Sequence, residues 1–522
     1  MTGGSSACAI WSSGLSGKNV RRNRRKKVMF WTEDAEELLG AVPAFVRERI
    51  REKAEVRARG EQRTQIDAAF VQSMQTGSRH PVEKFPAPCI SVDPIHDAFD
   101  RKYGVHAGMS GGAAVTGNPV EHFFQCLEDS VDSEAPAMAY LHVPFCCTRC
   151  LFCGFYAETT EPTAIAGYTD AVVRDIELTG AGLRNTGRKL SAVYFGGGTP
   201  TDLQASELEK LIRTIRRELP LTTDCEITVE GRLYDFTDEK VAAALDAGAN
   251  RFSFGVQSFD TGIRRMMGRV LGREELIERL NRIVELGDPY HAAVVIDLIY
   301  GLPGQREAEW IDSIDCGVNE TGIHGLDLYQ INLLPATPLM KKLNALPSMA
   351  TLKQQADLFL AGRSRMLEHG FDRLTIAHWG RDARERNRYN LWNKLNVDCI
   401  PLGAGAGGRW NGSRFFQQSD VHRFSTSVTE GLKPVISASK DPACASVMAS
   451  ATGQIEQRRI DVRELEKVAG MSLRETLFPL LDTWKKAGLI EDQDDIRLTP
   501  AGEFWSVNLQ KLIGLKLMEI AG

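Results

Sequence analysis

Six short β-rich segments alternate with five helical segments between residues 137 and 332, and few folds accommodate this order. The predicted strands are AMAYLHV (137–143), SAVYF (191–195), CEITVE (225–230), RFSFGV (251–256), AAVVIDLI (292–299) and LDLYQIN (326–332). The predicted helices cover residues 165–183, 204–218, 237–246, 272–286 and 305–320. Strands joined by helical crossovers run parallel, so we expect an α/β fold built on a parallel sheet. Functional side chains are then expected on the loops after the carboxyl ends of the strands.

The rest of the chain differs from this unit, and 522 residues are too many for a single core. We expect a disordered basic tail over 1–30, a small helical domain over 31–76, and a wrapping linker rich in Pro, Gly and His over 77–136. The apolar stripe of the helical domain is expected to be buried only against another unit or a partner. The αβ unit is assigned to 137–335, followed by an extension over 336–440 that contains PLGAGAGGRWNG (401–412). Residues 441–522 show the order helix, helix, hairpin, which predicts a winged-helix-like domain.

Charge, hydropathy and cysteine content indicate which partners and which cellular compartment to expect. The net charge of −5 does not favour a polyanion, and the basic block RRNRRKK (21–27) is interpreted as a solvated tail rather than a nucleic-acid or lipid contact. No apolar run reaches the roughly 18 residues of a membrane span. Eleven cysteines, four of them within residues 146–153, are unlike a disulfide framework. We therefore expect reduced thiols, a cytoplasmic location, no membrane span and no nucleic-acid partner.

The crowded cysteines lie directly after the first predicted strand. Cys146, Cys150 and Cys153 have the spacing CxxxCxxC. Three thiolates on one loop can bind three corners of a cubane iron–sulfur cluster and leave one iron open, which the amino and carboxylate groups of S-adenosylmethionine can occupy. A zinc site and clustered structural thiols are the alternatives, but structural zinc normally takes four ligands from paired knuckles and no second knuckle is present. For Cys147 no role is predicted, with an accessory ligand or acceptor as the alternative.

Motifs in order along the chain resemble the radical-SAM superfamily and, within it, its HemN-like group. They are YLHVPFCCTRCLFCGFY (140–156), YFGGGTPT (194–201), ITVEGR (227–232), FGVQSF (254–259), Arg269 and DLIYGLPGQ (297–305). The resemblance implies a partial (β/α)6 TIM-like barrel with a C-terminal HemN-like winged-helix-type domain. It also implies a [4Fe-4S] cluster and S-adenosylmethionine as cofactors, which together generate a 5′-deoxyadenosyl radical.

The same motifs supply candidate contacts to S-adenosylmethionine. Glycines at 196–198 let the backbone approach the ligand because a Cβ atom there would clash. Acidic residues at strand ends can accept hydrogen bonds from ribose hydroxyls, while an amide and a guanidinium can bind polar groups and a carboxylate. The resemblance places Tyr140 beside the methionyl part and Phe152 beside the adenine. The full candidate set is Tyr140, Phe152, Gly196, Gly197, Gly198, Thr199, Glu230, Gln257, Arg269 and Asp297.

A subgroup is indicated by the run C-x-T-R-C-x-F-C-G-F, which resembles the anaerobic haem-degrading radical-SAM methyltransferases (ChuW/HutW). DPIHDAFDRKYGVHAG (93–108) and LTPAGEFW (498–505) also resemble that subgroup, and the likeness covers about residues 90–522. It implies methyl transfer from S-adenosylmethionine to haem, ring opening and iron release, with a small electron-donor protein such as a flavodoxin or ferredoxin. Anaerobic coproporphyrinogen oxidation and haem delivery by a chaperone remain alternatives. His106 and His378 are candidate haem contacts, whereas His142 is expected to orient the backbone.

The N-terminal domain has a resemblance of its own. WTEDAEELLGAVPAFVRERIREKAEVRAR (31–59) is similar to the small helical domain at the end of a protochlorophyllide reductase subunit. That domain lies near a tetrapyrrole in its parent enzyme, so the resemblance implies a docking role here. A packing or protein-interaction helix pair is the alternative.

Overall fold

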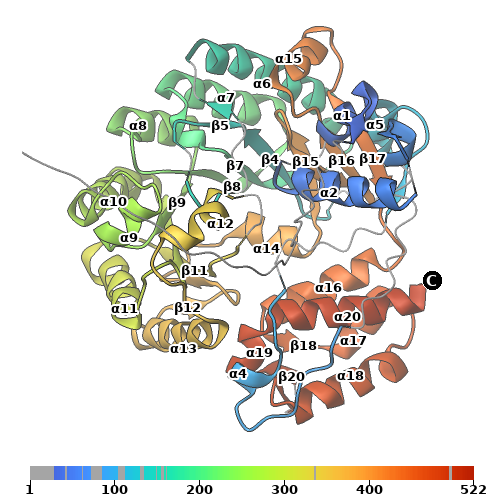
Figure 1. Cartoon of the computed structure of the whole chain (residues 1–522). Helices are drawn as coiled ribbons and strands as arrows, with labels where there is room; N and C mark the ends of the chain where they lie inside the picture. The colour runs from blue at the N-terminus through green and yellow to red at the C-terminus, as the bar shows by residue number, and fades with distance from the viewer. Residues whose placement is uncertain are drawn as a thin grey trace, which may run out of the picture.

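A parallel sheet surrounded by helices forms the centre of this computed structural model (Figure 1). The structure describes residues 29–40, 44–61, 63–71, 85–103, 112–129, 134–148, 150–153, 158–159, 162–333, 337–492 and 496–521. Six adjacent strands are parallel: β4 (Ala137–Val143), β7 (Leu190–Gly197), β8 (Leu221–Gly231), β9 (Arg251–Gln257), β10 (Ala293–Tyr300) and β11 (Gly325–Gln330). The crossovers contain α6 (Pro162–Leu183), α7 (Ala205–Glu218), α8 (Asp238–Ala247), α9 (Thr261–Met266), α10 (Arg273–Gly287) and α11 (Glu307–Asp315). The predicted α/β class is confirmed.

Residues on each strand alternate between the helices outside and the interior of the barrel. In β4, Leu141 and Val143 belong to the large apolar core between sheet and helices, whereas Tyr140 faces the interior. This follows from the two-residue period of a strand. The interior side also carries acids such as Glu230 and Asp297 near the carboxyl ends of β8 and β10. The fold thus concentrates polar side chains at one end of the barrel.

The sheet is larger than the six predicted strands: among the described residues it has 13 strands, in the order β12-β13-β11-β10-β9-β8-β7-β4-β14-β15-β16-β17-β3. β14 (Asp398–Leu402) pairs in parallel with β4. Antiparallel strands continue both edges: β15 (Gly407–Trp410), β16 (Ser413–Gln417), β17 (Val435–Lys440) and β3 (Ala113–Ala114) on one side, β13 (His378–Gly380) and β12 (Asp372–Arg373) on the other. The glycine-rich stretch 401–412 therefore joins β14 to the β15–β16 hairpin.

Further helices connect these strands: α12 (Pro338–Lys342), α13 (Leu352–Glu368), α14 (Arg388–Lys394) and α15 (Val421–Thr429). α14 differs from the others because it fills the interior of the barrel rather than covering its outside. Its Tyr389 and Trp392 pack with Met138, Tyr140 and Cys399 from the inward face. The barrel is therefore closed at this point by a helix from later in the chain.

The N-terminal module consists of α1 (Glu33–Gly40), α2 (Ala44–Gly60) and a parallel pair of strands, β1 (Phe30–Trp31) and β2 (Gln65–Ile66). Its buried side chains, which include Trp31, Leu39 and Phe70, form a cluster separate from the main core. The expectation that its apolar stripe needs another unit or a partner is therefore wrong. The short β1–β2 pair and the residues after β2 supply the missing cover.

The segment between that module and the barrel is less irregular than expected. It contains α4 (Pro94–Asp97) and α5 (Pro119–Glu128), whose first turn is capped by the side chain of Asn118. Trp505 Nε1 donates to the carbonyls of Pro94 and Ile95 at 3.1 and 3.0 Å. These contacts attach the segment to the C-terminal elements, as Figure 1 shows for α4 and α19.

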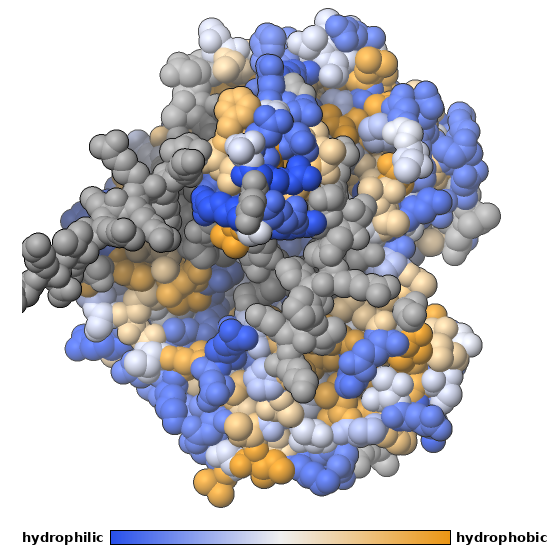
Figure 2. Space-filling view, turned by 45° about the vertical axis from the view of Figure 1, so that its right-hand side comes forward, coloured by the Kyte–Doolittle hydropathy of each residue, from blue (hydrophilic) through white to orange (hydrophobic). Residues whose placement is uncertain are grey.

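The C-terminal elements are α16 (Ala445–Glu456), β18 (Arg459–Ile460), α17 (Val462–Ala469), α18 (Arg474–Lys486), β19 (Ile490–Asp492), β20 (Ile496–Leu498), α19 (Pro500–Phe504) and α20 (Ser506–Ala521). Among them, α17, α18 and the β19–β20 hairpin have the predicted helix, helix, hairpin order, and further elements precede and follow them. On the face seen in Figure 2, hydrophobic residues form separate small groups among hydrophilic ones. Within the described ranges, each helix is too short or too polar to traverse a bilayer.

Candidate active site

The cysteine loop begins where β4 ends, at the carboxyl end of the parallel strands. Short strands β5 (Phe145–Cys146) and β6 (Glu158–Thr159) pair at its base. Cys146 and Cys150 are buried, Cys153 is half-buried and Cys147 is exposed. The three cysteines of the predicted cluster motif are thus less exposed than the fourth.

The glycine motif after β7 packs directly against this loop. Gly198 N donates to Val143 O, and Thr199 N donates to Phe145 O, both at 2.7 Å. A Cβ atom on Gly198 would lie 2.4 Å from Phe145 O. Gly197 has φ +107°, a conformation that side chains rarely adopt. These glycines are therefore required by the chain's own packing.

Thr199 also contacts a sulfur, since its Oγ1 lies 3.2 Å from Cys146 Sγ. Burial raises the pKa of the Cys146 thiol to about 11, and the charge of Cys153 adds to this effect. The hydroxyl of Thr199 and the guanidinium of Arg232 oppose it. Cys146 and Cys153 therefore share one electrostatic environment. A bound cation would favour the thiolate form of both cysteines.

The sulfurs do not meet at one point. Among the residues described, no three His, Cys, Asp or Glu side chains converge as ligands of a single metal ion would. A cubane has a different requirement, because each cysteine binds a different iron and the sulfurs need only surround a common volume. Three buried or half-buried cysteines on one loop are compatible with that requirement.

Two acids line the interior next to the glycine motif. Glu230 Oε2 would lie 2.8 Å from a Cβ atom on Gly196, so the carboxylate contacts the glycine backbone. Burial raises the pKa of Glu230 to about 7, against the effect of a hydrogen bond from Tyr194. The pKa of Asp297 is raised well above its usual value by burial and then by the charges of Asp327 and Glu230. Within the part of the chain that the structure describes, neither carboxyl forms an ion pair, and both are suited to accept hydrogen bonds from a ligand.

An amide and a guanidinium meet at the end of β9. Because Gly255 has no side chain, Gln257 Nε2 and Arg269 Nη2 both approach it; a Cβ atom there would lie 2.5 and 3.1 Å from them. Gln257 Oε1 and Arg269 Nε are buried without a hydrogen-bond partner in the described part of the chain. The Arg269 guanidinium lies 5.7 Å from the ring centre of Phe152, on the cysteine loop. Unpaired buried polar atoms beside this loop fit a missing polar ligand such as S-adenosylmethionine.

Tyr140 and His142 are two residues apart on β4, so their side chains lie on the same face of the strand. Tyr140 Oη is 2.9 Å from His142 Nδ1, and burial lowers the pKa of His142 to about 4, so the imidazole is neutral. Tyr168 Oη donates to the carbonyl of His142 at 2.6 Å, which fixes the backbone here. Tyr140 also stacks with Tyr389 of α14, at 5.8 Å between ring centres. The sequence around Tyr389 carries no motif that indicates this position.

The two candidate haem histidines have different outcomes. His378 is buried, with Nδ1 2.9 Å from Asp327 and Nε2 3.0 Å from Glu385. Both ring nitrogens thus face carboxylates inside the barrel, and this environment gives no support for a haem contact by His378. Glu385 also forms an ion pair with the buried Arg251 at 3.0 Å, so His378 belongs to a charged network inside the barrel. His106 lies outside the described residues.

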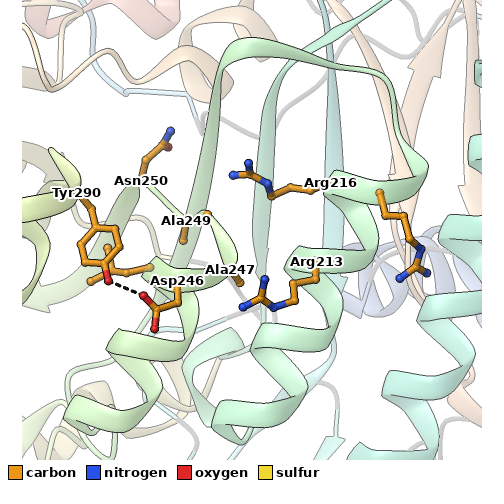
Figure 3. Close-up of a pocket in the computed structure, with 10 residues that line it drawn as sticks. Arg213, Arg216, Asp246, Ala247, Ala249, Asn250 and Tyr290 are labelled. Carbon is orange, nitrogen blue, oxygen red and sulfur yellow. Dashed lines mark hydrogen bonds between the residues drawn. The ribbon is translucent and has the colours of Figure 1, made fainter.

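Two cavities differ in their relation to the cysteine loop. A small one is lined by Thr148 of that loop together with Arg232, Arg264 and Arg269. A broader depression lies on the outside, between the carboxyl ends of α7 and α8, where Figure 3 shows Arg213 and Arg216 near Asp246 and Tyr290. Its lining residues are Arg213, Arg216, Arg217, Leu245, Asp246, Ala247, Gly248, Ala249, Asn250 and Tyr290. Because the helices run opposite to the strands, this depression is at the end of the barrel away from the cysteines.

Comparison with known families matches two parts of the chain. The family model described as the radical SAM superfamily matches residues 140–316, from β4 to the turn after α11. The model described as the proto-chlorophyllide reductase 57 kD subunit matches residues 31–74, which contain α1 and α2. The barrel and the N-terminal module thus resemble different families.

Whole proteins are also similar. The chain is 38% identical to anaerobilin synthase of Escherichia coli O157:H7 over 405 residues, which cover 76% of this chain and 88% of that protein. It is 30% identical to the heme chaperone HemW of Bacillus subtilis over 299 residues, or 56% and 76% of the two chains. The solved structure of coproporphyrinogen III oxidase (HemN) from Escherichia coli superposes with a TM-score of 0.67 at 20% identity, covering 78% and 96%. This last likeness shows a shared fold.

Proposed function

The chain belongs to the family of radical SAM enzymes that includes anaerobilin synthase, and on this premise we propose that it degrades haem without oxygen. The reaction proposed is methyl transfer from S-adenosylmethionine to the macrocycle, followed by ring opening and release of iron. The observation that carries this proposal is the 38% identity to anaerobilin synthase over 88% of that protein. The cofactors of the family are a [4Fe-4S] cluster and S-adenosylmethionine.

The cysteine loop is proposed to hold the cluster. When bound, the cluster and S-adenosylmethionine supply one-electron cleavage of a carbon–sulfur bond, which is chemistry of the cofactors rather than of the protein. Cys146, Cys150 and Cys153 would bind three irons and leave the fourth open. The apolar residues that pack around the loop, including Met267 and Leu339 against Leu151, would exclude water from it.

S-adenosylmethionine is proposed to lie between the glycine motif and the ends of β8, β9 and β10. Glu230 and Asp297 would accept hydrogen bonds from the ribose, and the unpaired Gln257 and Arg269 would bind polar groups of the ligand. The remaining proposed contacts are Tyr140, Phe152, Gly196, Gly197, Gly198 and Thr199. The raised pKa values of the two acids support a site that is incomplete without a hydrogen-bonding ligand.

The N-terminal module is proposed to help dock the tetrapyrrole. This rests on its similarity to part of a proto-chlorophyllide reductase subunit and on its separate core. Because that core is independent of the main one, removal of residues 1–76 should leave the barrel folded. We expect the truncated protein to bind haem more weakly in a spectroscopic titration, and equal affinity would contradict the docking role.

One assay tests the reaction. Reconstituted protein, incubated anaerobically with haem, a low-potential reductant and S-adenosylmethionine, should bleach the Soret band and form S-adenosylhomocysteine or 5′-deoxyadenosine. The variant Cys150→Ala should lose iron and activity, whereas Cys89→Ala, which changes an exposed cysteine outside the site, should keep both. Haem recovered unchanged from a protein with an intact cluster would refute degradation and favour a chaperone. Decarboxylation of coproporphyrinogen would favour an oxidase.

A further inference from the structure

The cysteine loop is held on its outer side by two residues that do not belong to the cysteine motif. Arg232, at the end of β8, donates from Nη1 to the hydroxyl of Thr148 and from Nη2 to its carbonyl, the latter at 2.6 Å. Asp202 accepts a hydrogen bond from the backbone N–H of Cys147 at 2.6 Å. Thr148 and Cys147 lie between Cys146 and Cys150, so both contacts act on the part of the loop that sets the spacing of these two cysteines.

The backbone of Arg232 is itself fixed by Thr201, which precedes Asp202 in the chain. Thr201 Oγ1 accepts from Arg232 N at 3.0 Å and donates to Arg232 O at 3.1 Å. Lys240 Nζ donates to Thr201 O at 3.2 Å. A Cβ atom on Gly231 would lie 2.3 Å from the Thr201 side chain, so the contact requires glycine. The end of β8 and the turn after the glycine motif therefore form one rigid support.

The guanidinium of Arg232 is directed at the cysteine loop. Within the described ranges Arg232 forms no ion pair, and the hydrogen bonds of its guanidinium go to Thr148 of the loop. A cluster bound by three thiolates is negatively charged, and reduction adds one more negative charge. A fixed positive charge close by stabilises the reduced form more than the oxidised form.

The other two arginines of the same cavity have different partners. Arg264 donates to the carbonyls of Val256, Ser258 and Leu271. Arg269 lies over Phe152 and approaches Gln257, in the proposed site for S-adenosylmethionine. Arg232 is therefore the member of this group that bonds to the cysteine loop itself.

We propose that Arg232 is a positioning residue for the cluster: its two hydrogen bonds to Thr148 hold the loop in its binding conformation, and its guanidinium stabilises the reduced cluster. This inference rests on the proposed function, because it takes Cys146, Cys150 and Cys153 as the cluster ligands. It assigns two separable effects to one side chain, one on retention of the cluster and one on its reduction potential.

The experiment compares full-length, anaerobically reconstituted wild type with Arg232→Gln and Arg232→Lys. Three quantities are measured: the iron and sulfide content per chain, the rate of iron loss to a chelator, and the reduction potential. The potential comes from a redox titration followed by electron paramagnetic resonance. Arg279→Gln is the matched control, since it removes the same charge from α10, where Arg279 donates to Asp238. Arg232→Gln should lose iron faster and reduce the ratio of reduced to oxidised cluster at least tenfold at a fixed potential, or about 59 mV for a one-electron couple. The control should match wild type in both.

Arg232→Lys separates the two effects, because lysine keeps the charge but cannot form the paired hydrogen bonds. It should show a potential close to that of wild type and a faster loss of iron. If Arg232→Gln fails to fold, this lysine variant still decides the retention effect, and equal iron loss from it and from wild type overturns the inference. A potential and an iron-loss rate in Arg232→Gln equal to those of wild type also overturn it, with the proposed function intact. Wild type that binds no cluster overturns the proposed function and the inference together.

Discussion

Glu230→Gln should stabilise the protein at alkaline pH. Burial raises the pKa of Glu230 from 4.5 to about 7. A carboxyl whose pKa is raised by folding binds its proton more tightly in the folded state, so stability falls as the pH rises from 4.5 to 7. The shift of about 2.5 units corresponds to about 3 kcal/mol at about 1.4 kcal/mol per unit. Glu230 is only partly shielded from solvent, which lowers the expected effect to about 2 kcal/mol.

The assay is urea unfolding without S-adenosylmethionine, followed by circular dichroism at pH 5 and pH 8. Glutamine has the same shape, can accept the hydrogen bond from Tyr194 and is neutral at both pH values. The variant should therefore exceed wild type by about 2 kcal/mol at pH 8 and by much less at pH 5. Loss of the Glu230 charge should also weaken binding of S-adenosylmethionine, by about tenfold for a 1.4 kcal/mol loss.

The reasoning fails if the variant gains equally at both pH values, because the gain would then not come from ionisation. It also fails if the variant is no more stable than wild type at pH 8. A stabilised variant that binds S-adenosylmethionine as well as wild type does would leave the burial argument correct and refute the ribose contact.

Three further substitutions test packing around the site and between domains. Gly197→Ala should destabilise the fold by about 2 kcal/mol or more in thermal unfolding, because φ is +107° and the new Cβ would lie 2.4 Å from the His142 ring. Lys433→Met should cost about 3–5 kcal/mol in urea unfolding since it leaves the buried Asp175 unpaired, and adding Asp175→Asn should recover part of this; no recovery would contradict the pairing argument. Trp505→Phe should cost about 1–2 kcal/mol and speed proteolysis near α4, because two hydrogen bonds to that segment are lost. An unchanged proteolysis rate would show that these bonds do not hold the segment.

The parallel strands of the barrel could be predicted from sequence because each is a local signal. β10 is an apolar run interrupted only by Asp297, and a strand buried on both faces requires such a run. β14 could not be predicted in the same way, since it has five residues including Pro401 and pairs with a strand far earlier in the chain. α5 was missed although Asn118 and Pro119 are a capping residue and a first-turn proline; the prolines of its surroundings were attributed to a linker.

The residues of the candidate site also differ in whether a local sequence signal indicates them. Cys146, Cys150 and Cys153 are close in sequence, so their spacing alone indicates a shared ligand. Arg232 and Asp202 carry no comparable signal, because their role depends on how the ends of two strands approach the loop in space. The same holds for His378, whose carboxylate neighbours come from β11 and from the loop before α14.

The pairing of β14 with β4 bears on how the protein is made. Ala137 pairs with Asp398, so one edge of β4 has no neighbour until about 260 more residues have left the ribosome. During that interval the free edge can template association with other nascent chains. The barrel can acquire its full set of strands only when translation is well advanced. Ribosome-bound chains that stop before β14 should therefore aggregate more readily than those that extend past it.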